Sequence, residues 1–174
     1  MPARRDAITL VSIATAVAAI DQLTKSVLVS AIRPGPSSAR IDFLGGWMAI
    51  EYTENRGAAF GLFSGLAPIL VVASVVILVG LLLHYSRQTR PPLWETVAIG
   101  SIAGGAIGNL VDRVRLGYVV DFVSVGPWPN FNVADSAITI GVVMLIWGWM
   151  RSELRWGAAR AIDREGTWAK DQHS

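Results

Sequence analysis

Four long apolar stretches dominate this sequence, at residues 8–32, 67–85, 93–111 and 134–150. Each approaches the roughly 20 residues that a helix needs to cross the hydrocarbon core of a bilayer. The composition agrees, because 52% of the 174 residues are hydrophobic and only 16% are charged, which is more apolar than an ordinary soluble domain. We therefore expect an integral membrane protein, mainly α-helical, with four transmembrane helices and both termini on one side.

The basic residues predict the orientation. Nine of the fifteen Lys and Arg residues flank the chain ends and the link between the second and third spans: Arg4, Arg5, Arg87, Arg90, Arg151, Arg155, Arg160, Arg164 and Lys170. Five lie in the two other loops: Arg33, Arg40, Arg56, Arg113 and Arg115. Because cytoplasmic segments carry the excess of basic residues, we expect both termini in the cytoplasm. The net charge of +2 follows from these flanks and does not indicate nucleic-acid binding.

The first span has one alternative interpretation. Arg4, Arg5, an apolar run and Ala16-Val17-Ala18 together resemble a secretory signal peptide with its cleavage site. The apolar run resumes after Asp21 and continues to Ile32, which is longer than a signal peptide's hydrophobic region. This length favours a spanning helix.

Several chemistries are excluded by residue types. The chain has no cysteine, so disulfides, thiol nucleophiles and zinc-thiolate sites are impossible. Its two histidines, His84 and His173, both fall on the expected cytoplasmic side. We therefore expect no metal, no cofactor and no Ser-His triad at the outer face.

The first outer loop, residues 33–66, is too long for a simple connector. Residues 41–53 carry strand-forming side chains interrupted by Gly45-Gly46, a pattern that predicts a short hairpin, and residues 56–63 suggest a short helix or turn at the interface. Residues 151–174 are charged, and we expect a loosely ordered cytoplasmic tail. In the third span, Gly100, Gly104 and Gly108 recur every four residues, which predicts close packing against another helix.

Charged residues inside the spans require a partner or a function, since each costs about 2.5 to 3.5 kcal/mol at the bilayer centre. Asp21 and Lys25 lie four residues apart, so they can form an ion pair on one helix face. This pair could orient the helix or contact a substrate, and we expect a supporting role. Near the outer end of the third span, Asn109 and Arg113 share a face with Asp112 beside them. They form either a polar helix end with Arg113 reaching the headgroups or a substrate contact.

Two aspartates near the outer boundary give the sharpest signal. Asp121 stands alone in the apolar run Val119 to Val123, and Asp135 begins the last span. Taken alone, Asp135, or Asn132 before it, could simply cap the helix. If the two carboxylates face each other about 4 Å apart, they repel by roughly 4 kcal/mol, so one keeps its proton at neutral pH. Such a pair holds one base and one acid, which suits attack of water on a peptide carbonyl, and either aspartate could start protonated.

Five segments together resemble the bacterial lipoprotein signal peptidase family, signal peptidase II, from about Ala19 to Met150. They are Asp21-Gln22-Leu23-Thr24-Lys25, Asn55-Arg56-Gly57-Ala58-Ala59-Phe60-Gly61, Gly108-Asn109-Leu110-Val111-Asp112-Arg113, Gly117-Tyr118-Val119-Val120-Asp121-Phe122 and Phe131-Asn132-Val133-Ala134-Asp135-Ser136. Each segment alone is a weak signal. All of them, in this order on a four-span frame, are specific.

The resemblance implies fold and function. We expect one four-helix peptidase domain over residues 1–150, with a small extracytoplasmic β-cradle and a short interfacial helix from the first outer loop. The implied activity is cleavage of diacylglyceryl-modified prolipoproteins just before the lipidated cysteine, by a monomer in contact with membrane lipid, at the outer face of the bacterial inner membrane.

The resemblance also implies roles for individual residues. Asp121 and Asp135 match the family's catalytic aspartates. The matching supporting or substrate-binding residues are Asp21, Lys25, Asn55, Gly57, Asn109, Asp112, Arg113 and Asn132.

Three other classes compete with this prediction. A small proton-coupled membrane transporter would carry an essential acid near mid-membrane, whereas these acids cluster at one interface. An assembly protein would tolerate Asp121→Asn. A serine-lysine peptidase would need a serine beside Lys25, and Ser26 points away from the face that Lys25 shares with Asp21.

Overall fold

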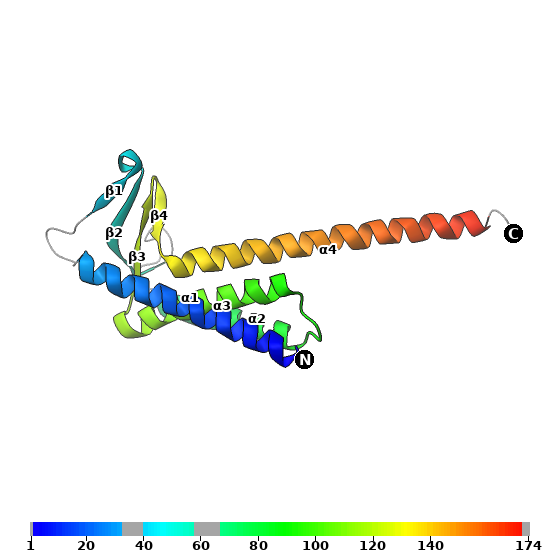
Figure 1. The fold of residues 1–174 in the computed structure, drawn as a ribbon, viewed down its shortest axis with the longest axis horizontal. Coiled ribbons are helices and arrows are strands. Elements are labelled where there is room, and N and C mark those ends of the chain that lie inside the picture. The colour runs from blue at the N-terminus through cyan, green and yellow to red at the C-terminus, as the bar shows by residue number, and fades with distance from the viewer. Residues whose placement is uncertain (1, 33–39, 58–66, 172–174) are drawn as a thin grey trace.

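The structure is a computed structural model. It describes residues 2–32, 40–57 and 67–171, and for residues 67, 70 and 155–171 it describes the backbone alone. The elements in chain order are α1 (Arg4–Ala31), β1 (Ile41–Phe43), the 3-10 turn η1 (Leu44–Gly46), β2 (Met48–Asn55), α2 (Ala67–Ser86), α3 (Leu93–Leu116), β3 (Val119–Val125), β4 (Trp128–Phe131) and α4 (Val133–Asp171). Figure 1 shows the four strands gathered at one end of the helices, with the N-terminus at the other end.

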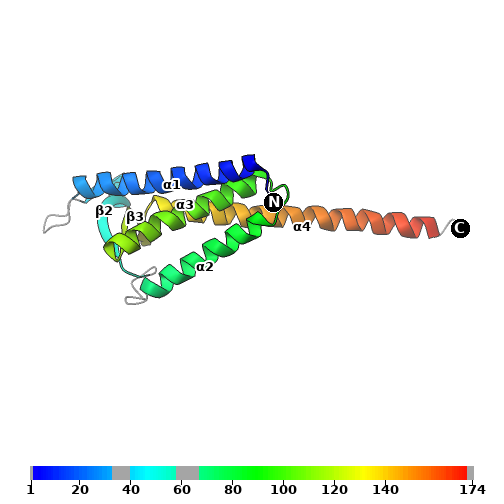
Figure 2. The same ribbon diagram turned by 90° about the horizontal axis from the view of Figure 1, so that it is seen from below.

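Helix α3 is the centre of the bundle, because it packs against each of the other three helices. Figure 2 shows it beside α1, with α2 diverging from α1. A Cβ atom at Gly104 would lie 2.5 Å from the backbone oxygen of Ala14, so the close approach of α1 requires a glycine there. A Cβ at Gly100 would meet Ile13 of α1 at 3.1 Å. The predicted packing ridge is confirmed.

The helices differ from the predicted spans at two ends. Helix α3 continues to Leu116 and ends at Gly117, whose φ of 81° is left-handed, so Arg113 and Arg115 lie in its last turn and not in a loop. Helix α4 continues to Asp171 as one helix, where we expected a loosely ordered tail from residue 151. Residues 151–171 contain no proline and many residues of high helix propensity, and this explains the difference.

The outer surfaces of the helices are apolar. Ile8, Val11, Leu23 and Val27 of α1 are each more than half exposed, as expected for a helix surrounded by lipid. Of the described helices, Arg4–Ala31 and the segment Val133–Leu154 are long and apolar enough to cross a membrane, and the apolar part of α2, Val71–Ser86, is shorter. Four spanning helices therefore remain a prediction.

The strands form one antiparallel sheet in the order β1-β2-β3-β4. The predicted hairpin is confirmed by β1 and β2, which pair through Ile41 and Ile50. We expected the small sheet in the first outer loop, which supplies β1 and β2, and did not anticipate that β3 and β4, between α3 and α4, supply the other two strands. Their pairing could not be anticipated locally, since Asp121 of β3 pairs with Thr53 of β2, far away in sequence. The predicted interfacial helix falls largely on residues 58–66, outside the described residues.

Candidate active site

The two aspartates singled out from the sequence both contact one residue, Asn132. Asp121 lies in β3 and Asp135 in the first turn of α4. The side-chain amide of Asn132 donates to Asp121 Oδ1 at 2.7 Å, and the backbone N–H of Asn132 donates to Asp135 Oδ2 at 3.2 Å. Asn132, which is fully buried, thus holds one oxygen of each carboxylate.

The helix-cap interpretation of Asn132 and Asp135 also holds. Asn132 Oδ1 accepts a hydrogen bond from the backbone N–H of Asp135 at 2.9 Å, and Asp135 Oδ2 accepts one from the backbone N–H of Asn132. This reciprocal arrangement is a capping box. It leaves Asp135 Oδ1 available, and that oxygen accepts from Asn109 Nδ2 at 2.8 Å. The cap fixes the Asp135 side chain without consuming both oxygens.

The second oxygen of Asp121 is held from the end of β2. Asn55 Nδ2 donates to Asp121 Oδ2 at 2.9 Å, and the backbone N–H of Gly57 donates to Asn55 Oδ1 at 3.1 Å. Burial raises the pKa of Asp121 to about 7, and the negative charge of Asp135 adds to this rise, although the amides of Asn55 and Asn132 oppose it. Asp121 therefore retains a proton up to neutral pH.

Lys25 lies behind this pair and is buried. Its ammonium contacts Asp21 Oδ2 at 2.8 Å, so the predicted ion pair is present, and it contacts Asp112 Oδ2 at the same distance. It also donates to Asn109 Oδ1 at 3.2 Å. An ammonium can only donate, so Asn109 must turn its oxygen toward Lys25 and its NH₂ group toward Asp135.

The buried carboxylates of Asp21 and Asp112 connect separate elements. Asp21 Oδ1 accepts the backbone N–H of Ala134 in α4 at 3.0 Å, and Asp112 Oδ2 accepts that of Val120 in β3 at 3.1 Å. A Cβ at Gly108 would lie 2.6 Å from Asp21 Oδ2, so this glycine makes room for the carboxylate. The ion-paired group thereby ties α1 and α3 to the two elements that carry the aspartates.

Gln22 belongs to this network, although sequence reasoning did not single it out as a site residue. Its Nε2 donates to Asp112 Oδ1 at 2.8 Å and to the backbone oxygen of Gly108 at 3.1 Å. The sequence signal that could have identified Gln22 is its spacing from Lys25, because residues three positions apart lie on the same helix face.

Arg113, another predicted site residue, makes one hydrogen bond within the described residues. Its Nη1 donates to the backbone oxygen of Asn109 at 3.4 Å, and among the described residues it forms no ion pair. Most of its N–H groups have no acceptor among the described residues.

Apolar helices around a pair of amide-held aspartates are the arrangement expected of a membrane-embedded aspartic peptidase. Residues 13–151 match the family described as Signal peptidase (SPase) II. The chain therefore belongs to the signal peptidase II family, which acts on lipoprotein precursors, and the resemblance found in the sequence is confirmed.

Individual relatives agree with this family. The lipoprotein signal peptidase of Syntrophomonas wolfei is 38% identical over 127 residues, covering 73% of this chain and 83% of that protein. The lipoprotein signal peptidase of Rhodococcus jostii is 41% identical over 140 residues, covering 77% and 68%. A bacterial membrane enzyme solved at 2.3 Å resolution is similar in fold, with a TM-score of 0.75 and 32% identity over 83% of this chain and 89% of that one. These comparisons do not favour the transporter.

Proposed function

We propose that this chain removes the signal peptide from diacylglyceryl-modified prolipoproteins, cutting on the N-terminal side of the lipidated cysteine with a water molecule activated by Asp121 and Asp135. Membership of the signal peptidase II family supports the substrate class. The observation that carries the mechanism is the shared contact of both carboxylates with Asn132. Two acids held side by side in a buried place are suited to acid–base catalysis.

The pair works with one proton. A pKa of about 7 for Asp121 supports a protonated acid beside an ionised base at neutral pH. The base takes a proton from the water while the acid hydrogen-bonds the scissile carbonyl oxygen, and the oxygen of the water attacks the carbonyl carbon. Collapse of the tetrahedral intermediate breaks the C–N bond, and the departing nitrogen takes a proton from the pair. The new amino terminus belongs to the lipidated cysteine.

The neighbouring residues position the pair and the substrate. Asn109, Asn132 and Asn55 donate to the carboxylates, so they fix the carboxylates around the place of the water. We assign the free N–H groups of Arg113 to carbonyl oxygens of the bound peptide. Lys25 keeps Asn109 in the required orientation.

The membrane arrangement belongs to the same proposal. The four helices cross the bacterial inner membrane, both termini lie in the cytoplasm, and the sheet and the two aspartates lie at the outer face. A lipid-anchored peptide presents its cleavage site at headgroup depth, which is the depth of the aspartates in this orientation. The enzyme acts as a monomer.

Cleavage of a diacylglyceryl-modified prolipoprotein by the purified protein in detergent tests the proposal. Wild type should cleave with and without EDTA, whereas Asp121→Asn and Asp135→Asn should each lose activity by at least a thousandfold. Asp42→Asn is the matched control, because this aspartate is exposed in β1 and its ion pair among the described residues is with Arg40, and it should leave the rate unchanged. Activity persisting in either of the first two variants would remove that residue from catalysis.

A further inference from the structure

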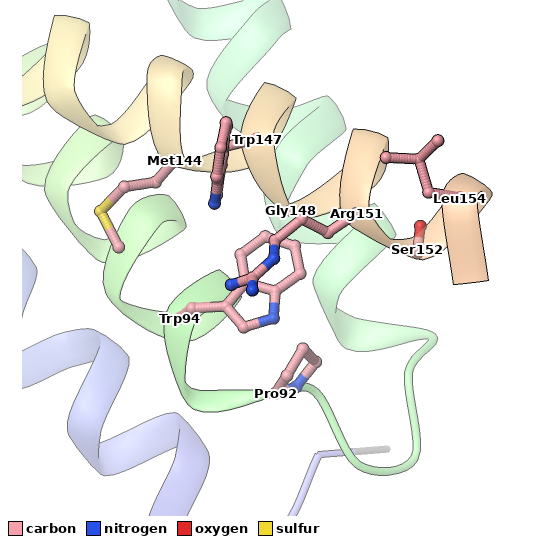
Figure 3. Close-up of a pocket in the computed structure, with 8 residues that line it drawn as sticks. All are labelled: Pro92, Trp94, Met144, Trp147, Gly148, Arg151, Ser152 and Leu154. Atoms are coloured by element: carbon pink, nitrogen blue, oxygen red, sulfur yellow. The ribbon is translucent and has the colours of Figure 1, made fainter.

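A pocket between α3 and α4 lies at the opposite end of the bundle from the sheet. This pocket of about 820 Å³ is formed between the start of α3, at Pro92 and Trp94, and the middle of α4, at Trp147, Gly148 and Arg151. Figure 3 shows the Arg151 side chain reaching from α4 toward the start of α3. None of the candidate active-site residues lines it.

The shape of the pocket depends on a glycine. A Cβ at Gly148 would overlap the indole ring of Trp94, so the absence of a side chain lets this ring lie directly against α4. Helices α3 and α4 therefore contact each other beside the pocket through the Trp94 ring and the backbone at Gly148.

Beside the pocket lie hydrogen-bond donors for which the described residues supply no acceptor. The guanidinium of Arg151 lies 5.9 Å from the centroid of the Trp147 ring. Within the described part of the chain it forms no ion pair, and the indole N–H groups of Trp94 and Trp147 donate to no other group. A cation and two N–H donors beside one cavity fit an anion with several oxygens, such as a phosphodiester.

The surroundings of these donors are apolar. Leu93, Trp147 and Leu154 are 69%, 60% and 73% exposed, and Met144 lines the pocket seven residues before Arg151. Seven residues of helix rise about 10 Å, so the pocket lining changes from apolar at Met144 to cationic at Arg151 over about this distance. A lipid headgroup with the first methylene groups of its acyl chain has a similar length. An amphiphile with an anionic head and an apolar tail matches this gradient.

The charge of this end of the molecule selects the same ligand. Arg4, Arg5, Arg87 and Arg90 lie at the end of the bundle that carries the N-terminus (Figure 2). Basic pockets between transmembrane helices on the cytoplasmic side suit anionic lipid head groups. We propose that this pocket binds one anionic phospholipid of the inner leaflet, its phosphate at Arg151 and an acyl chain along Met144. The inference goes beyond peptide cleavage and relies only on the proposed orientation of the helices.

Native mass spectrometry of the full chain, released from micelles containing phosphatidylglycerol or phosphatidylcholine, tests this proposal. Wild type should retain one phosphatidylglycerol in preference to phosphatidylcholine, and Arg151→Gln should weaken that retention about tenfold, since one charge-assisted contact is lost. Arg87→Gln is the matched control, because it removes a charge at the same end from an exposed residue outside the pocket. It should retain the lipid as wild type does.

Three results would overturn the proposal: equal retention by Arg151→Gln and wild type, equal loss in both variants, or displacement of the lipid by inorganic phosphate at a comparable concentration. The last result would identify a free-phosphate site in place of a lipid site. Arg151→Gln should unfold in detergent at the same temperature as wild type, which shows that it is folded. The lipid result is thereby independent of whether the peptidase proposal succeeds.

Discussion

At the scale of single residues, the carboxylates depend on a cation that touches neither of them. Lys25 donates to Asn109 Oδ1, and this leaves the amide NH₂ of Asn109 for Asp135. Asn132 also donates to Asn109 Oδ1, at 3.1 Å. The amide oxygen of Asn109 therefore accepts hydrogen bonds from both Lys25 and Asn132. The orientation of the two aspartates is therefore set one contact further out, in the ion-paired group of Asp21, Lys25 and Asp112.

Replacing Lys25 by Met should destabilise the protein strongly. The change leaves the buried carboxylates of Asp21 and Asp112 without their cation, and the expected loss in the free energy of unfolding is about 3 to 5 kcal/mol. Thermal unfolding in detergent measures it. Adding Asp112→Asn should recover part of the loss, because one buried charge is removed. An unchanged midpoint in Lys25→Met would show that the ion pairs do not stabilise the fold.

The pH dependence of cleavage follows from Asp121. Its pKa is raised from an ordinary 3.8 to about 7, so the proton that the pair needs is present below pH 7 and is lost as the pH rises through this value. We expect kcat/KM to fall about tenfold per pH unit above pH 7. A pH–rate profile in detergent with one substrate measures this. A rate that stays constant to pH 9 would contradict the raised pKa.

At the scale of elements, the contact between α1 and α3 depends on glycine. A Cβ at Gly104 would lie 2.5 Å from Ala14 O and 2.7 Å from Val17 Cβ, so Gly104→Ala should separate the helices and reduce the free energy of unfolding by about 1 to 3 kcal/mol. Gly80→Ala in α2 is the matched control, since a Cβ there meets nothing within 4 Å. Thermal unfolding of both variants separates the effect of lost helix packing from the effect of alanine on helix propensity, because both variants replace a helical glycine by alanine. Equal midpoints would show that α1 can move without cost.

Helices and strands were predictable to different degrees. Apolar length located each helix, because that signal is local, and the spacing of Asp21 and Lys25 identified their ion pair. Half of the sheet was missed because β3 acquires its pairing from β2, more than sixty residues earlier. The bond from Asp21 to the backbone of Ala134, 113 residues apart, likewise has no local signal. The position of Asp121 and Asp135 among apolar residues near the outer boundary made them candidates, and the family resemblance implied their role. The way in which they are held could be learned only from the structure.

At the scale of the whole molecule, the two ends of the bundle have different chemistry. The sheet and the aspartates lie at one end, where α1 and α3 finish and α4 begins, and the other end carries the N-terminus (Figure 1) and the chain segments that hold Arg4, Arg5, Arg87 and Arg90. Between them the helix surfaces are apolar. This difference supports the orientation that we propose, with the N-terminal end on the side of an anionic inner leaflet.

The absence of cysteine from the sequence makes this orientation directly measurable. Asp42→Cys places a thiol in exposed β1, and Arg87→Cys places one in the exposed link between α2 and α3. A membrane-impermeant maleimide should label Asp42→Cys in cells whose outer membrane alone is permeable, and Arg87→Cys only after the inner membrane is opened. The wild-type chain, which has no thiol, gives the background. Labelling of Arg87→Cys in cells with an intact inner membrane would invert the topology, place the two aspartates in the cytoplasm, and separate them from a substrate that is cleaved at the outer face.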